Sequence, residues 1–174
     1  MALTRLASIP PKNPKSPKPM PPQVPQTRSI ALLTHPPINI FGVNYTGDGF
    51  QIGDQMIPTP IALRRAIKDQ LHSGMRFDFG IPATAICIET ALPHVRGTVT
   101  HIEPDIETSP NSTTLQVSVP STGGTVTLTV TIANSSAQLP PIDSIVPLAF
   151  DLKQMLLFDG SGDRIYPPIA LTLE

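Results

Sequence analysis

Apolar and polar residues alternate over several long stretches of the chain. Leu115, Val117 and Val119 alternate with polar residues, and residues 126–132 place Val, Leu and Ile at every second position with Thr between them. The Ser-Thr-Gly-Gly stretch at 121–124 separates the two runs. Because successive strand side chains point to opposite faces, this period of two predicts a hairpin with one apolar face and one threonine-rich face.

Shorter alternating runs predict further strands. They lie at 43–45, 50–52, 75–81, 95–103 and 146–150. Pro147 has no N–H to give a neighbouring strand, which favours the edge of a sheet for the last of these. An apolar run at 155–158 follows, and the Asp-Gly-Ser-Gly stretch at 159–162 predicts a turn.

One segment has helical periodicity. Leu63, Ile67 and Leu71 recur at intervals of four, which places them on one face of a helix. Thr59 is a suitable N-cap and Pro60 suits the first helical position. The pattern therefore predicts a mainly β protein with one short α-helix at 60–72.

The first 28 residues have a different composition. They hold eight prolines with lysines between them. Proline fixes φ and removes backbone donors, so helix and sheet ladders cannot form there and an extended, disordered arm is expected. We therefore expect a disordered Pro/Lys-rich tail at 1–28, a folded domain at 29–168 and a short C-terminal tail at 169–174.

Charge is distributed unevenly between the arm and the body. No acidic residue precedes Asp48, while five basic residues do, so that stretch carries +5. The other seven Lys and Arg residues meet all thirteen acids, which gives the remainder −6. A basic arm of this kind fits a solvated tail without a partner, or one that touches anionic lipid or an acidic surface.

Cys87 is the only cysteine, so a disulfide within the chain is impossible and a reducing compartment is expected. Its apolar neighbours predict a small buried side chain. No apolar stretch approaches the roughly 20 residues that span a bilayer. We expect a cytoplasmic protein.

Three groups of residues carry a family resemblance. The last strands match a "V-x-L-x-F-D" pattern followed by "L-F-D" at 146–151 and 157–159; Pro37, Asn39 and Phe41 match an "S-P-x-M-N-F" junction; and 97–104 matches a "G-x-V…E-P" strand that includes Glu103. In this order they resemble the C-terminal regulatory domain of ATPase subunits from maltose-type sugar ABC importers, which contains a TOBE module.

The resemblance implies a fold and candidate contact residues. It implies two intertwined small β-barrels of the oligonucleotide-binding (OB-like) style, without the nucleotide-binding domain. Pro37, Asn39, Phe41 and Glu103 are the candidate junction or protein-contact residues. After Ile81 the Arg and Glu of the family's "G-I-R-P-E" motif are missing.

Candidate chemistry is sparse. The chain has no G-x-x-x-x-G-K-[ST] loop to hold ATP phosphates and no nucleophile-turn motif, so we expect neither an enzyme nor a cofactor. His101 and Glu103 share one strand face, but no third ligand follows at a zinc spacing, so no metal site is expected. An acidic body without tryptophan argues against nucleic acid as a partner.

The resemblance implies a non-catalytic regulatory or scaffolding protein. It would act by homodimerisation or by docking on an ABC importer ATPase subunit, peripheral to the inner membrane through that complex. Two alternatives stay open. One is a TOBE module that binds a small oxyanion such as molybdate, with Arg96 as the anion contact, and the other is a remnant of a longer ATPase gene.

Overall fold

A computed structural model describes residues 24–34, 37–105, 112–133 and 139–167. These residues form a mainly β protein with few helical turns, as the alternation predicts. The expected disorder at 1–23 and the expected tail at 169–174 lie outside the described residues. No helix within the described ranges is long and apolar enough to cross a bilayer.

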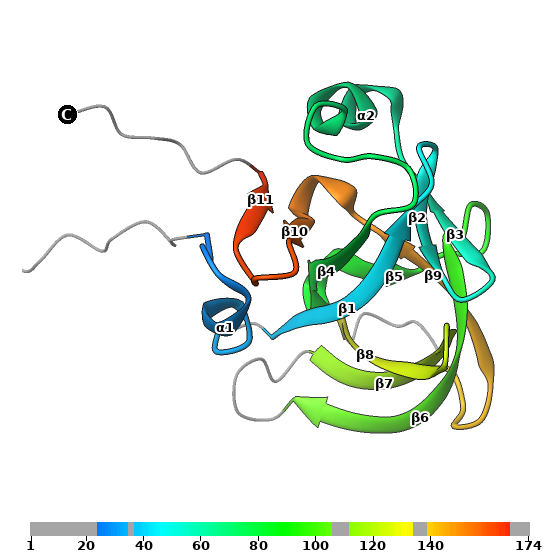
Figure 1. The fold of residues 1–174 in the computed structure, drawn as a ribbon. Coiled ribbons are helices and arrows are strands. Elements are labelled where there is room, and N and C mark those ends of the chain that lie inside the picture. The colour runs from blue at the N-terminus through cyan, green and yellow to red at the C-terminus, as the bar shows by residue number, and fades with distance from the viewer. Residues whose placement is uncertain (1–23, 35–36, 106–111, 134–138, 168–174) are drawn as a thin grey trace, which may run out of the picture.

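Two antiparallel sheets make up the body (Figure 1). The six-stranded sheet has the order β11-β10-β4-β1-β2-β3. Its strands are β1 (Ile38–Tyr45), β2 (Gly49–Ile52), β3 (Gln55–Pro58), β4 (Arg76–Pro82), β10 (Leu156–Phe158) and β11 (Arg164–Tyr166). The strands predicted at 43–45, 50–52 and 75–81 are therefore present.

The five-stranded sheet has the order β5-β9-β6-β7-β8. Its strands are β5 (Ile86–Ile88), β6 (Val95–Asp105), β7 (Ser112–Ser121), β8 (Gly124–Ala133) and β9 (Ile145–Phe150). The predicted hairpin is β7 with β8, closed by the pair Ser121 and Gly124. β8 also lies next to β5 and to the 3-10 turn η1 (Ala83–Ala85), so this sheet curls as a half-barrel.

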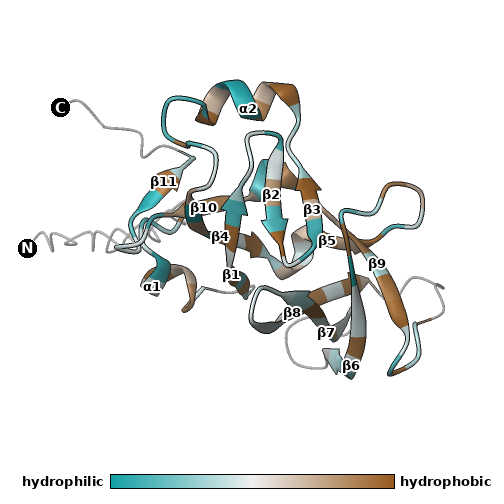
Figure 2. Cartoon of the chain, turned by 45° about the vertical axis from the view of Figure 1, so that its right-hand side comes forward, coloured by the Kyte–Doolittle hydropathy of each residue, from teal (hydrophilic) through white to brown (hydrophobic). Residues whose placement is uncertain are grey.

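The two sheets share one hydrophobic core. Burial alternates strictly along β1, where every second residue is buried. Figure 2 shows hydrophobic and hydrophilic residues distributed in bands along several of the strands. Phe41 of β1 lies 5.3 Å from Phe79 of β4 and 6.4 Å from Phe150 of β9, measured between ring centroids. The expected small barrels thus take the form of two curved sheets around a common aromatic centre.

The helical segments differ in detail from the expectation. α2 (Ile61–Ile67) is shorter than the predicted 60–72, and its N-cap is Pro60 instead of Thr59. The Thr59 hydroxyl is buried without a hydrogen-bond partner, so it does not cap the helix. Ile67 and Leu71 are buried, as the helical period predicts.

A second helix, α1 (Arg28–Ala31), was not predicted. The Thr27 hydroxyl caps it by accepting from the Ile30 N–H at 3.4 Å. A further 3-10 turn, η2 (Leu152–Gln154), follows β9.

The expected edge position of 146–150 is wrong. β9 pairs with β6 on one side and with β5 on the other, so it lies inside the sheet. Pro147 lies one residue beyond the β5 ladder, which ends at Leu148, and its carbonyl still accepts from the Glu89 N–H. The missing backbone N–H of Pro147 can be tolerated here because the ladder between β5 and β9 ends at Leu148.

The folded part begins before the expected boundary at residue 29. Thr27 forms a β-bridge with Asp163, and the Arg164 N–H donates to the Gln26 carbonyl at 3.0 Å. The Arg164 guanidinium also donates to the carbonyls of Val24 and Pro25. Residues 24–28 therefore belong to the body and lie beside the turn that leads into β11 (Figure 1).

The expected burial of Cys87 is also wrong. Its neighbour Ile86 is buried, whereas Cys87 is exposed on β5 and lies 3.7 Å from the Ala149 carbonyl through Sγ. A run of apolar residues does not override the strand period, which points alternate side chains outward.

Candidate functional site

Asn39 is buried on β1 and joins the two sheets through its side chain. Its amide nitrogen donates to the Thr129 carbonyl at 2.8 Å and to the Ile81 carbonyl at 3.3 Å. Its amide oxygen accepts from the Thr129 N–H at 2.6 Å. The amide therefore pairs with both backbone groups of one residue on β8, as a neighbouring strand would.

Gln55 repeats this arrangement at another junction between the sheets. Its side-chain nitrogen donates to the Arg96 carbonyl at 3.0 Å, and its side-chain oxygen accepts from the Arg96 N–H at 2.6 Å. This connects β3 to β6. The sequence reasoning missed Gln55, because an amide in a short strand gives no signal of its partner.

Phe41 and Pro37, the other two residues of the predicted junction, also contact the rest of the fold. Phe41 is only 4% exposed and belongs to the aromatic centre of the core. Pro37 is exposed, and its carbonyl accepts from the Ala83 N–H at 2.9 Å, which fixes the start of β1 to η1. The structure thus places Pro37 directly before β1 and Asn39 and Phe41 on it, and all three contact other elements of the fold: η1, β8 and the aromatic core.

Glu103 lies apart from these three, on β6 in the other sheet. It is exposed and pairs through its backbone with Thr114 of β7. β6 pairs with β9 only from Val95 to Thr98, with two further hydrogen bonds at Val99. Among the described strands, none pairs with the opposite side of 101–105, so Glu103 lies on a strand edge.

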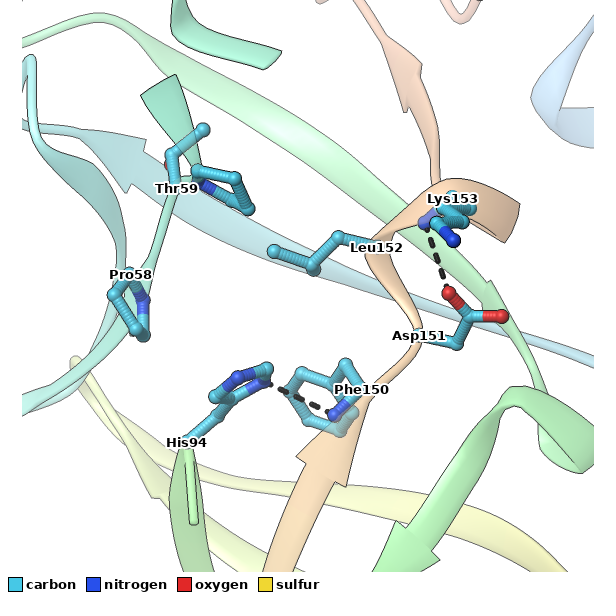
Figure 3. Close-up of a pocket in the computed structure, with 8 residues that line it drawn as sticks. Pro58, Thr59, His94, Phe150, Asp151, Leu152 and Lys153 are labelled. Carbon is cyan, nitrogen blue, oxygen red and sulfur yellow. Dashed lines mark hydrogen bonds between the residues drawn. The ribbon is translucent and has the colours of Figure 1, made fainter. Parts of the chain in front are cut away.

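One cavity among the described residues opens between the segment that joins β3 to α2, the residue before β6, and the end of β9 with η2 (Figure 3). It has a volume of about 380 Å³. Apolar and polar side chains both line it: Pro58, Thr59, Pro60, His94, Phe150, Asp151, Leu152 and Lys153.

His94 lines this cavity, and Phe150 fixes the position of its ring. Its Nδ1 accepts from the Phe150 N–H at 3.0 Å, and its ring packs edge-on against the Phe150 ring at 5.9 Å. Burial lowers the pKa of His94 below its usual 6.5, which favours the neutral ring. With Nδ1 occupied, the proton of the neutral ring lies on Nε2, so His94 offers the cavity a donor and no free basic nitrogen.

Asp151 accepts hydrogen bonds from the turn beside the cavity. Its carboxylate accepts from the Gln154 side chain at 2.9 Å and from the Lys153 N–H at 3.2 Å, which caps η2. The bond from Gln154 is the main cause that lowers the pKa of Asp151. Asp151 forms no hydrogen bond with His94, whose Nδ1 instead accepts from the Phe150 N–H.

The residues considered for an anion or metal site, Arg96, His101 and Glu103, do not line this cavity. Arg96 is exposed and does not line it, and His101 lies with Glu103 on the β6 edge. Within the described ranges no three His, Cys, Asp or Glu side chains come close enough to hold a metal ion. No protein-family model matches the chain, and no curated protein matches it.

Proposed function

We propose that this chain is a non-catalytic docking module that acts as a regulatory or scaffolding protein. It associates with a second copy of itself or with the regulatory domain of an ABC importer ATPase. This placement would keep it in the cytoplasm beside the membrane, through the transporter complex. The family resemblance at 37–41, 97–104 and 146–159 motivates the choice of partner.

The half-strand at 101–105 is the observation that carries the proposal. A strand edge presents unpaired N–H and C=O groups, which can pair with a strand from another chain. His101, Glu103 and Pro104 are exposed there, and Ile102 is half-buried between them. Two other edges are partly covered by described residues: Gln26 and Thr27 pair with residues at the start of β11, and Asn39 pairs with Thr129 on β8.

The residues that match the family pattern best do not offer a binding surface. Leu148, Phe150, Leu157 and Phe158 are at most 4% exposed. Their burial supports a shared packing pattern, and it leaves contact with a partner to exposed residues such as Glu103. This favours docking through backbone pairing at the β6 edge over docking through the matched side chains.

Light scattering and a pull-down against a co-expressed sugar-importer ATPase test the proposal. The His101→Lys/Glu103→Lys variant places two lysines on the β6 edge, and lysine on an edge strand opposes pairing with another strand. We expect wild type to self-associate or to retain the ATPase, and the double variant to lose that association with an unchanged melting temperature. Thr122→Lys, in the exposed β7–β8 turn, is the matched control.

Three results would contradict the proposal. They are a strictly monomeric wild type that retains no ATPase, an association that the lysine pair leaves intact, and a micromolar affinity for Mg-ATP in calorimetry. The oxyanion alternative gains no specific support, since Arg96 lies outside the cavity.

A further inference from the structure

A small polar cavity lies where the β7–β8 turn meets the six-stranded sheet. It has a volume of about 120 Å³. Sites for drug-sized ligands occupy roughly 300–1,000 Å³, so this cavity suits an ion or a small group instead. Its polar lining consists of Asn44, Gln51, Arg76, Ser121 and Thr122.

Three of these residues form a row across neighbouring strands. Asn44 of β1 is the cross-strand partner of Arg76 on β4 and of Gln51 on β2. Residues that lie directly opposite each other in a sheet share one face, with their Cβ atoms about 4.5–5.5 Å apart. The guanidinium group and the two side-chain amides therefore belong to the same face of the sheet.

Two glycines make room for this arrangement. A Cβ at Gly42 would lie 3.0 Å from Nη2 and 3.3 Å from Nε of Arg76, so the guanidinium rests directly on β1. A Cβ at Gly53 would lie 2.8 Å from the Pro120 carbonyl oxygen, so the β2–β3 turn is in close contact with the end of β7. That contact brings residues 121–122 beside the polar row.

The polar side chains of this cavity are available to a ligand. Within the described ranges, none of the five forms a side-chain hydrogen bond or an ion pair with another residue. Asp78, two residues after Arg76 on β4, is paired with Arg28 instead. Asp54, in the β2–β3 turn, is exposed and does not line the cavity. The lining therefore offers one positive charge and several donors, and it includes no acid.

We propose that this cavity binds a small tetrahedral oxyanion such as phosphate. The Arg76 guanidinium supplies the positive charge and a planar fork of N–H donors that matches pairs of phosphate oxygens. The amides of Asn44 and Gln51 and the hydroxyls of the β7–β8 turn supply further donors. A tetrahedral ion presents four oxygens to these groups, whereas a carboxylate presents only two. Arg96, the anion contact considered from the sequence, is not part of this site.

Titrations followed by heteronuclear NMR test the site directly. The probes are inorganic phosphate, methyl phosphate and the planar anion acetate, each added to the full chain at constant ionic strength. We expect phosphate to shift the signals of the Arg76 Nε–H and of the Asn44 and Gln51 side-chain amides to saturation, and acetate to bind more weakly. Tighter binding of methyl phosphate would support a phosphate ester as the ligand, and tighter binding of inorganic phosphate would support the free ion.

An arginine variant measures the contribution of the charged group. Arg76→Gln should weaken phosphate binding roughly tenfold or more, because hydrogen bonds between charged groups are the strong ones. Arg65→Gln, at an exposed arginine of α2 outside the cavity, removes the same charge and should bind phosphate as wild type does. Both variants should keep the melting temperature of wild type.

Gly42→Ala tests the position of the guanidinium without removing it. The new Cβ would displace the flexible end of the Arg76 side chain, so we expect a loss of phosphate affinity with an unchanged melting temperature. Gly160→Ala, where a Cβ meets no atom within 4 Å, is the control and should bind as wild type does. The proposal is overturned if phosphate does not shift the three signals to saturation, if acetate binds as tightly as phosphate, or if Arg76→Gln or Gly42→Ala keeps the affinity of wild type.

Discussion

Single side chains connect the two sheets of this protein. Asn39 and Gln55 each offer an amide donor and an amide acceptor to one residue of the opposite sheet, Thr129 and Arg96 respectively. Buried backbone groups need partners, and an amide side chain can supply both kinds where no strand is adjacent. Asn39 is only 8% exposed, so its bonds have little competition from water.

Asn39→Ala should therefore destabilise the fold. The change removes three hydrogen bonds and leaves the backbone of Thr129 without its side-chain partner. We expect a loss of roughly 1–3 kcal/mol in the free energy of unfolding, measured by urea denaturation. Asn44→Ala, at a half-buried position of the same strand, is the control and should cost clearly less. Equal losses in the two variants would contradict the role assigned to Asn39.

His94 should make stability depend on pH. Burial lowers the pKa of His94, so the unfolded chain binds a proton more readily than the folded one. The stability that neutral His94 contributes is complete above the unfolded pKa of about 6.5. It is lost as the pH falls through that value toward the pKa of the folded protein. Protonation would also remove the Nδ1 acceptor for the Phe150 N–H.

Urea unfolding at two pH values measures this effect. Between pH ~7.5 and ~5.5, wild type should lose more unfolding free energy than His94→Gln, which cannot titrate. Gln70→Ala, at an exposed residue without a titratable group, is the control and should keep the pH dependence of wild type. An unchanged pH dependence in His94→Gln would contradict the assignment.

At the scale of elements, the contact between β6 and β7 depends on a glycine. A Cβ at Gly97 would lie 2.6 Å from Val117 Cγ1 and 2.8 Å from the Ser118 carbonyl oxygen. Both distances are far shorter than a carbon atom tolerates, and one of the atoms belongs to the backbone. The two strands can lie this close only because position 97 has no side chain.

Gly97→Ala should accordingly destabilise the five-stranded sheet. We expect a loss of roughly 1–3 kcal/mol, because the strands must move apart or Val117 must leave its preferred packing. Thermal unfolding followed by circular dichroism measures the change. Gly160→Ala is the control: a Cβ there meets no atom within 4 Å, so its melting temperature should stay near that of wild type.

At the scale of the whole molecule, the segment at 24–28 is bound to the turn that leads into β11. Its backbone forms hydrogen bonds with Gly162 and with Arg164, the first residue of β11, and Arg28 adds its ion pair with Asp78. These bonds join the beginning of the described chain to the end of the six-stranded sheet.

Two truncations separate the basic segment from this sheet contact. Removal of 1–23 should leave the melting temperature unchanged, because the contacts of 24–28 remain. Removal of 1–28 deletes at least two backbone hydrogen bonds and the ion pair, and should lower the melting temperature by about 5 °C. Differential scanning calorimetry of both proteins provides the comparison, and equal melting temperatures would show that residues 24–28 add no stability.

The order of apolar and polar residues by itself determined the longer strands, whereas the short strands β3, β5 and β11 were not predicted. Leu115, Val117 and Val119 are all fully buried on β7. The Ser-Thr-Gly-Gly turn at 121–124 closes the hairpin between β7 and β8, as predicted. This succeeds because strand period and turn chemistry are local properties of the chain. The burial of Ile67 and Leu71 followed from the same kind of information, although α2 ends at Ile67 and Leu71 lies beyond it.

The tertiary structure alone decided which strands are neighbours and what each side chain meets. Pro147 indicated an edge, yet β5 and β6 enclose its strand, and Cys87 indicated burial, yet it points outward. Asn39 resembled a junction residue, and it contacts Thr129, 90 positions away in the chain. A hydrophobic pattern predicts which face of a strand is buried. Contacts between residues far apart in the sequence depend instead on how the two sheets pack around their common core.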